Sequence, residues 1–243
     1  MLSVRRKRAR RQIKTSEAIA LEILRGIVSS GKTSGDRLPL ESEMLLEYGV
    51  SRPSLREALR LLEFQGLIAI RPGPGSGTVV GAATAPNLAR MLVLYLHLAN
   101  ATYDELLSTW QMTEPMLARL AAQNPDRAAV RAAMEPFLTQ PTAGAEKDRG
   151  GAQHFHDVVA ELADNKVLAL ICHGVGAIAD EYLVEEGHID VPSNLLKDHV
   201  WIAQAIYDGK AEAAATLMSE HMTHIVAAYR HQWPEKVGET SWI

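Results

Sequence analysis

The chain has 243 residues, 47% of them hydrophobic and 22% charged, so it is too apolar to be disordered and long enough for two domains. Its single cysteine, Cys172, excludes a disulfide framework and a cysteine zinc cluster, and it suits a reducing compartment. We predict a cytoplasmic protein without membrane contact, because no apolar run reaches the roughly 18 residues of a membrane span and none follows the basic N-terminus as in a signal peptide.

The charge changes sign along the chain. Residues 1–80 carry 14 Lys and Arg against 8 Asp and Glu, a net of +6, and the remaining 11 basic and 21 acidic residues give −10 for residues 81–243. A nucleic-acid-binding module joined to a sensor module would show this asymmetry. We predict that the basic arm, residues 1–15, contacts DNA phosphates, with a solvated tail as the alternative. The arm is densest in charge at Arg5, Arg6, Lys7, Arg8, Arg10 and Arg11.

A winged helix-turn-helix domain is predicted for residues 16–80. Apolar residues recur at helical spacing in three segments, and Gly49 fits the left-handed end of the second segment because glycine tolerates a positive φ. Ser51 is typical of the N-cap that begins the third. Two β-runs around a Gly/Pro-rich turn then predict a small hairpin, the wing. The expected elements are helices from Ser16 to the turn at Gly31, over Glu41–Tyr48 and over Arg52–Gln65, and strands over Leu67–Ile70 and Thr78–Val80.

Two arginines mark the third helix as the one that reads DNA. Arg52 and Arg56 lie four residues apart, on one face and near the N-terminus, where a recognition helix enters the major groove. Arginines placed there can fork onto guanine. The alternative for Arg56 is an ion pair with Glu41 or Glu57.

The run GDRLPLESEMLLEYGVSRPSLREALRLLEFQGLIAIRPGPGSGTVV resembles the DNA-binding domain of the GntR family. In that family the start of the recognition helix and the wing tip touch the operator. Members often carry a DNA-contacting arginine after the glutamate of the LPxE turn, where this chain has Ser42, so we expect a shifted operator preference with Arg37 or the basic arm compensating. The resemblance implicates Ser51, Arg52, Ser54, Arg56 and Gly73 in DNA binding.

The rest of the chain is predicted to be helical. After a linker over residues 81–86, residues 87–231 predict an antiparallel bundle of six or seven helices whose interior could hold a ligand, followed by a tail over residues 232–243. We also expect this helical domain to be the dimerisation domain, through which two chains mainly pair. We expect a loop over residues 139–150 and helices over residues 87–99, 103–122, 126–138, 151–163, 166–186, 193–208 and 211–231.

Three histidines stand out in this half. His156, His199 and His221 lie on three different predicted helices, each bracketed by apolar residues at helical spacing. Imidazoles that converge from different helices can hold a divalent metal such as zinc or nickel. The alternative is that each is a hydrogen-bonded core histidine.

This half also resembles the helical FCD domain of the FadR subfamily of GntR regulators, in the Glu114–Pro115 step, in the FH pair followed by Asn165, and in the spacing of His199 and His221. The resemblance implies a dimer, a small-molecule effector and one divalent metal per chain.

Two positions depart from the FCD pattern. Many members hold the metal through three histidines and an Asp four residues before the first, where this chain has Ala152. Two outcomes stay open: weak metal binding through three histidines plus water or the effector, or no metal binding. Trp110 lies about where many members carry an arginine that meets a carboxylate effector. Because both positions are apolar, we expect a more hydrophobic effector, such as a lipid-derived acid or its thioester. The expected ligand pocket consists of Trp110, Glu114, Ala152, His156, His199 and His221.

We therefore predict a non-enzymatic, ligand-responsive transcription regulator, a repressor, that binds a pseudo-palindromic DNA operator as a homodimer. One alternative is a metal-dependent hydrolase that uses the three histidines with Asp157 or Glu220 as base, which leaves the N-terminal third unexplained. Another is an architectural DNA-binding protein without a ligand. No nucleophile elbow, Walker loop or dinucleotide fingerprint indicates a different enzyme.

Overall fold

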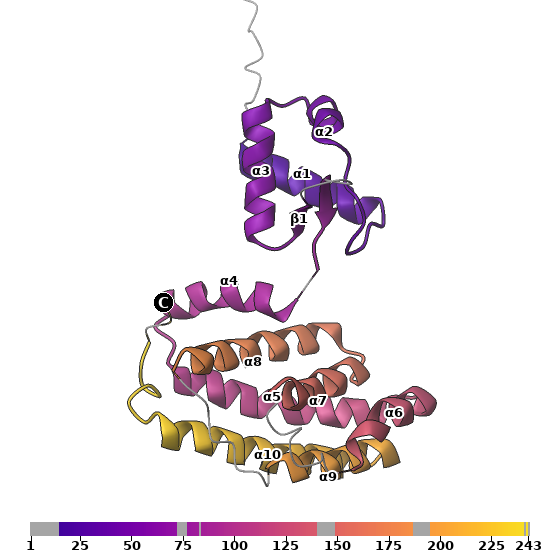
Figure 1. Ribbon diagram of the computed structural model, residues 1–243, viewed down its shortest axis with the longest axis vertical. Helices are drawn as coiled ribbons and strands as arrows, with labels where there is room; N and C mark the ends of the chain where they lie inside the picture. Colours follow the sequence, from indigo (N-terminus) through magenta and orange to yellow (C-terminus); the bar gives the residue numbers. More distant parts are fainter. Residues whose placement is uncertain are drawn as a thin grey trace, which may run out of the picture. The chain divides into compact units, whose positions relative to one another are not determined.

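A computed structural model describes residues 15–71, 77–82, 84–139, 149–186, 195–240 and 242, and for the helical residues 149–153, 180–186 and 195–196 it describes the backbone alone. The chain divides into two compact units, Met1–Ala83 and Thr84–Ile243. Among the described residues, the first unit contains three helices and a hairpin, and the regular elements of the second are all helices (Figure 1). The mainly helical fold with a small N-terminal hairpin is as predicted.

The N-terminal unit begins with three helices whose ends follow local rules. Thr15 caps the first by accepting a hydrogen bond from the Ala18 amide, and Ser51 caps the third by accepting one from the Ser54 amide. Gly49 ends the second helix with a φ of 63°, as its position in the sequence predicts. The helices are α1 Ser16–Ser29, α2 Glu41–Tyr48 and α3 Arg52–Phe64.

One apolar cluster joins these helices to the hairpin. Ile19 and Ile23 of α1 and Leu55 and Leu59 of α3 are at most 2% exposed, and α1 packs along α3. Met44 brings the short α2 into the same core. Burying such side chains supplies most of the stability of a small domain, at roughly 1.5–3 kcal/mol each.

The hairpin pairs strands β1 Ile68–Arg71 and β2 Gly77–Val80 in antiparallel register, with Ile68 opposite Val80. The chain before α2 adds to β2 on its other edge, through a bridge between Arg37 and Val79 and a hydrogen bond from the Leu38 amide to the Thr78 carbonyl. Gly73, the expected wing-tip contact, lies outside the described residues.

The second unit is a bundle built around one long central helix. Helix α5 packs against α10, α8, α7 and α9, and α4 lies along α8 (Figure 1). The shared core includes Trp110, Leu117, Phe155, Ile202 and Met222, all at most 4% exposed. No helix of the described residues is both long and apolar enough to cross a membrane. The helices are α4 Ala85–Leu98, α5 Tyr103–Gln123, α6 Arg127–Met134, α7 Arg149–Leu162, α8 Lys166–Glu186, α9 Leu195–Asp208 and α10 Ala211–Gln232.

The helix expected over residues 126–138 is shorter in the structure. It ends as α6 at Met134 and continues as one 3₁₀ turn, η1 Glu135–Phe137. Pro136 explains the change, because proline has no amide hydrogen to continue the α-helical pattern. Much of the expected loop over residues 139–150 lies outside the described residues, and its last two residues already belong to α7.

The segment after α10 packs back on the bundle. We call residues 233–240 together with Trp242 the C-terminal strap. Carbonyls of Val237 and Glu239 accept hydrogen bonds from the Asp104 and Tyr103 amides in the first turn of α5, at 3.0 and 3.1 Å. The Trp242 indole donates to the Ala101 carbonyl at 2.9 Å and is 7% exposed. The strap therefore satisfies amide hydrogens that a helix N-terminus leaves without partners.

Candidate DNA-reading face and buried histidine site

The outward face of α3 is basic. Arg52, Arg56 and Arg60 recur every four residues and are all exposed, while Leu55 and Leu59 on the opposite face are buried. Since residues four apart share a helix face, the three guanidinium groups line one side of α3. This is the arrangement that a recognition helix requires, with the DNA-facing side chains anchored by a buried stripe behind them.

Hydrogen bonds at the start of α3 hold the residues expected to meet DNA. The Ser51 and Ser54 hydroxyl oxygens lie 2.8 Å apart, so one donates to the other. The Arg56 Nε lies 3.5 Å from Glu41 Oε2, one of the two ion pairs considered from the sequence, and both side chains are well exposed. A long, solvated pair of this kind contributes little stability, so Arg56 can exchange it for a DNA group. Arg37 is exposed beside the hairpin.

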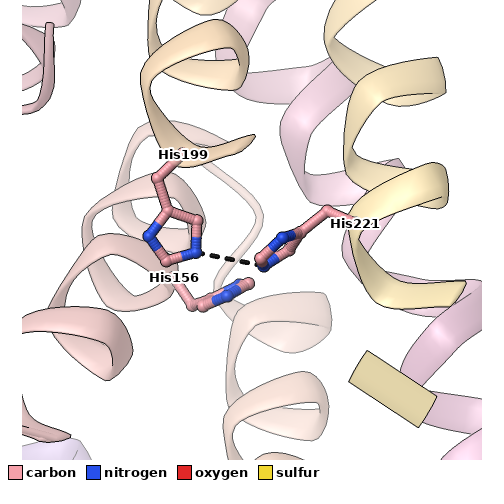
Figure 2. A group of neighbouring side chains, drawn as sticks. All are labelled: His156, His199 and His221. Carbon is pink, nitrogen blue, oxygen red and sulfur yellow. Dashed lines mark hydrogen bonds between the residues drawn. The ribbon is translucent and has the colours of Figure 1, made fainter. Parts of the chain in front are cut away.

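In the second unit, the three predicted histidines meet in the core. His156 from α7, His199 from α9 and His221 from α10 turn their rings toward one another (Figure 2), and each is at most 8% exposed. One ring nitrogen from each lies within 4.8 Å of the other two. The Nε2 atoms of His199 and His221 are 3.0 Å apart, close enough for a hydrogen bond in which one ring donates. We call these residues the three-histidine cluster.

Carboxylates orient two of the three rings from behind. Glu114 Oε2 lies 3.0 Å from His156 Nδ1, and Asp198 Oδ2 lies 3.4 Å from His221 Nδ1. An ionised carboxylate can only accept, so each Nδ1 carries the hydrogen and each Nε2 carries the lone pair. Carboxylates in this position orient histidines that bind metals.

Trp110 and Glu114, which were expected in the ligand pocket, belong to the same network. The Trp110 indole donates to Glu114 Oε1 at 3.1 Å, and its ring packs edge-on against Tyr229. Glu114 is 1% exposed and accepts hydrogen bonds from Trp110 and His156. Ala152 lies one turn before His156 on α7 and has no atom that could bind a metal.

Burial disfavours the charged form of two of the three histidines. It lowers the pKa of His199 and of His221 well below the usual value, and the repulsion that a proton on neighbouring His156 would exert lowers both pKa values further. Burial also raises the pKa of Asp198. Neutral imidazole is the form that coordinates a metal ion. Cys172 plays no such part, since burial raises the pKa of its thiol to about 11.

The donor set fits a divalent cation of the zinc or nickel class. Tetrahedral zinc with Zn–N bonds of about 2.0–2.1 Å separates its ligand nitrogens by roughly 3.3 Å. The nitrogens here are 3.0 Å apart for His199 and His221 and within 4.8 Å for all three pairs, so small side-chain movements would bring them into range. A fourth ligand would come from outside the cluster. His154 is exposed, and Asp157 Oδ1 lies 3.4 Å from His173 Nε2 on α8.

Sequence reasoning missed Asp198. The residue directly precedes His199, but adjacent residues of a helix point about 100° apart, and Asp198 contacts His221 on α10 instead. In the sequence, an acidic residue next to a candidate metal ligand is only a weak sign that it orients a histidine, because the histidine it contacts lies on another helix.

Comparisons with known proteins give a consistent result. Residues 15–80 match the family described as bacterial regulatory proteins, gntR family, and residues 105–224 match the FCD domain. An uncharacterized HTH-type transcriptional regulator of Mycobacterium tuberculosis is 30% identical over 228 residues, covering 89% of this chain and 92% of the relative. The HTH-type transcriptional repressor NanR of Citrobacter rodentium is 27% identical over 235 residues, covering 89% and 85%.

A solved structure shares the fold. The Streptococcus agalactiae GntR structure superimposes with a TM-score of 0.57 at 22% identity, covering 87% of this chain and 99% of that one. The chain therefore belongs to the GntR family, as a DNA-binding transcription regulator whose helical C-terminal half is a ligand-responsive FCD domain.

Proposed function

We propose that the protein is a repressor that binds a pseudo-palindromic operator as a homodimer, and that an effector reaches a divalent metal held by His156, His199 and His221. The observation that carries this proposal is the three-histidine cluster, buried and oriented from behind by carboxylates, in a chain whose other half presents an arginine-lined helix. We place the protein in the cytoplasm, where its operator would be.

The proposed DNA contacts lie at the N-terminus of α3. Arg52 and Arg56 would read base edges in the major groove, and Ser51 and Ser54 would hold the backbone phosphates. Arg37 and the wing tip at Gly73 would add flanking contacts. A two-fold dimer would place two such helices on half-sites about 34 Å apart, which is why the operator should be pseudo-palindromic.

At the proposed metal site, some residues would bind the ion and others would orient those that bind it. His156, His199 and His221 would hold the ion, while Glu114 and Asp198 would keep Nδ1–H of His156 and His221 turned outward so that Nε2 faces inward. The ion would supply a Lewis-acidic position for a polar group of the effector. Ala152 contributes no ligand, so three protein ligands leave room for that group.

The effector is proposed to be largely apolar. Trp110 offers no charge, and its indole hydrogen is engaged by Glu114, so it is not positioned to bind a carboxylate as an arginine would. The described buried residues of this unit include one acidic side chain and three histidines but no Lys or Arg. A lipid-derived acid or thioester that meets the site with one polar group suits these surroundings.

Binding of effector and DNA would be coupled. If the effector favours a form of the dimer that fits the operator poorly, it weakens operator binding by the same factor by which operator weakens effector binding. The hydrolase alternative gains no support, because Glu220 is exposed and Asp157 lies by His173.

The DNA half of the proposal is tested with an operator selected from random duplexes. The double variant Arg52→Ala, Arg56→Ala should lose sequence preference while retaining its helical content, with each lost bidentate contact worth about 1–3 kcal/mol. Arg60→Ala is the matched comparison, because Arg60 lies one turn further from the N-terminus of α3 than the two arginines expected to read base edges, and its loss should leave sequence preference much less changed. Unchanged sequence preference in the double variant would contradict the assignment.

The metal half is tested by elemental analysis after dialysis against zinc or nickel. Wild-type protein should retain about one ion per chain, and His156→Ala should lose it. His154→Ala, an exposed neighbour on α7, is the control and should bind like wild type. A protein that takes up neither ion would show that the histidines serve another purpose.

A further inference from the structure

One acidic residue, Glu41, lies against the row of arginines on α3. Arg52, Arg56 and Arg60 share one exposed face of that helix at spacings of four residues, where like charges repel one another. Among the described residues, Arg56 is the one member of the row with an ion-pair partner, because its Nε lies 3.5 Å from Glu41 Oε2. Glu41 therefore offsets the positive charge in the middle of the row.

The core of the DNA-binding unit fixes where Glu41 and Arg56 meet. Met44, one turn after Glu41, and Leu55, directly before Arg56, are 0% and 1% exposed, and they anchor α2 beside α3. Glu43, the other acidic residue in the first turn of α2, accepts a hydrogen bond at 2.8 Å from the amide of its own N-cap residue. Of these two carboxylates, Glu41 is therefore the one that contacts the recognition helix.

The contact with Glu41 uses only one edge of the Arg56 guanidinium. A guanidinium carries hydrogens on Nε and on both Nη atoms. Glu41 accepts from Nε, and a fork of Nη1 and Nη2 can still donate to O6 and N7 of one guanine. The Arg56 side chain is 65% exposed, as access to DNA requires. Arg56 can therefore read a guanine while it keeps its contact with Glu41.

A DNA phosphate, in contrast, competes with Glu41 for Arg56, because both groups are anions. On DNA without the operator sequence Arg56 gains no guanine fork, and the backbone phosphates are the partners that every sequence offers. To bind one, the guanidinium must leave Glu41 or bring the carboxylate close to the phosphate, where like charges repel. Glu41 therefore penalises a phosphate contact of Arg56 more than it penalises a guanine contact.

From this geometry we infer that Glu41 is a specificity-determining residue of the DNA-reading face, which directs Arg56 to guanine and away from phosphate. It is a positioning residue, since it acts through Arg56 and reads no base itself. The inference rests on the proposed reading of base edges by Arg56. A group that penalises the wrong partner more than the right one raises the ratio of operator affinity to nonspecific affinity.

The test measures that ratio for the full-length protein by fluorescence anisotropy. The two ligands are the operator selected from random duplexes and a scrambled duplex of the same length and base composition. Glu41→Gln removes the charge and keeps the size and one acceptor oxygen. An exposed ion pair changes an equilibrium constant by roughly two- to fivefold, and a dimer on two half-sites contains two such pairs. Glu41→Gln should therefore lower the ratio by about 4- to 25-fold, mainly by tightening binding to the scrambled duplex.

The salt dependence of binding gives a second readout, which a purely structural role of Glu41 would leave unchanged. On scrambled DNA, each Arg56 released from Glu41 can neutralise one further phosphate and displace about 0.9 counterions. For two chains, the slope of the logarithm of the association constant against the logarithm of salt concentration should steepen by up to about 1.8. On the operator the slope should stay as in wild type.

Two further variants separate this effect from a general change in charge. Glu57→Gln removes a carboxylate that is exposed on α3 and, within the described part of the chain, has no ion-pair partner. It should shift both dissociation constants alike and leave their ratio within twofold of wild type. Glu41→Gln combined with Arg56→Ala should give the same ratio as Arg56→Ala alone, because the proposed effect passes through Arg56. Circular dichroism checks that all variants keep their helices.

Failure of the inference and failure of the proposed base contact give different results. A ratio within twofold of wild type in Glu41→Gln, an equal fall in Glu57→Gln, or an effect of Glu41→Gln that persists in full without Arg56 would overturn the inference and leave the base contact standing. Arg56→Ala tests the base contact and should lower the ratio by itself. An unchanged ratio in Arg56→Ala would refute the contact and the inference together.

Discussion

Replacing Glu114 by glutamine changes one atom in the buried network and should reverse the tautomer of His156. Glu114 now accepts from the Trp110 indole at 3.1 Å and from His156 Nδ1 at 3.0 Å. The indole can only donate, so the single oxygen of glutamine must stay with Trp110. The new NH₂ group then faces His156 Nδ1, which must accept, and the ring hydrogen moves to Nε2.

This tautomer should weaken metal binding. Nε2 of His156 must lose its hydrogen to bind the ion. The ring must then return to the tautomer with hydrogen on Nδ1, and that hydrogen points at the amide NH₂ of the glutamine. A buried donor left unsatisfied costs about 1–3 kcal/mol. At 1.36 kcal/mol per factor of ten, we expect the zinc affinity to fall by about 10- to 100-fold, the range seen when partners behind a metal-binding histidine are removed.

Competition with a chromophoric chelator measures this affinity, and ¹⁵N NMR of the histidine rings reports the tautomer directly. Glu212→Gln is the control, because it makes the same chemical change in a side chain that is 79% exposed and paired with Arg119. Zinc affinity within twofold of wild type, or a His156 ring that keeps its hydrogen on Nδ1, would refute the reasoning.

Three further predictions concern stability. Burial lowers the pKa of His199 and His221 well below 6.5, so below that pH the unfolded metal-free chain binds protons that the folded chain does not. The contribution of these histidines to the free energy of unfolding should therefore be full above pH 6.5. It should fall by about 1.4 kcal/mol per pH unit for each histidine as the pH drops below that value. Urea unfolding between pH 7.5 and 5.5 measures the slope, and His199→Leu should reduce it by about half; an unaltered slope would show that other groups cause it. Trp242→Ala removes a ring that is 7% exposed and its hydrogen bond to the Ala101 carbonyl, so the free energy of unfolding of the C-terminal unit should fall by about 2–4 kcal/mol in chemical denaturation. Trp201→Ala, at an exposed position, is the control and should cost under about 0.5 kcal/mol. Equal losses would mean that the C-terminal strap contributes nothing to stability. Gly49→Ala places a Cβ at a φ of 63° and should cost about 1–2 kcal/mol in thermal unfolding, while Gly49→Asn should cost less; the reverse order would contradict the left-handed assignment.

The elements of the DNA-binding unit could be predicted from the sequence because their signals are local. The period of the apolar residues, the Ser51 cap and Gly49 each act within one or two turns, and helices α2 and α3 begin at the predicted residues. The same local logic located His156, His199 and His221 on three helices with apolar flanks. It also placed Arg52 and Arg56 on one exposed face.

Which side chains contact one another was decided only by the tertiary structure. Glu114 meets His156 across 42 residues, Asp198 meets His221 across 23, and Trp242 meets Ala101 across 141. Helical periodicity says which face of a helix is buried but not which helix lies against it, so it could suggest that the histidines point inward without showing that they meet. Glu114 meets His156 and the C-terminal strap meets the start of α5 because α5 lies in the centre of the bundle, where four other helices pack against it. Asp198 meets His221 because α9 packs against α10, and in both places a buried polar group must find its partner.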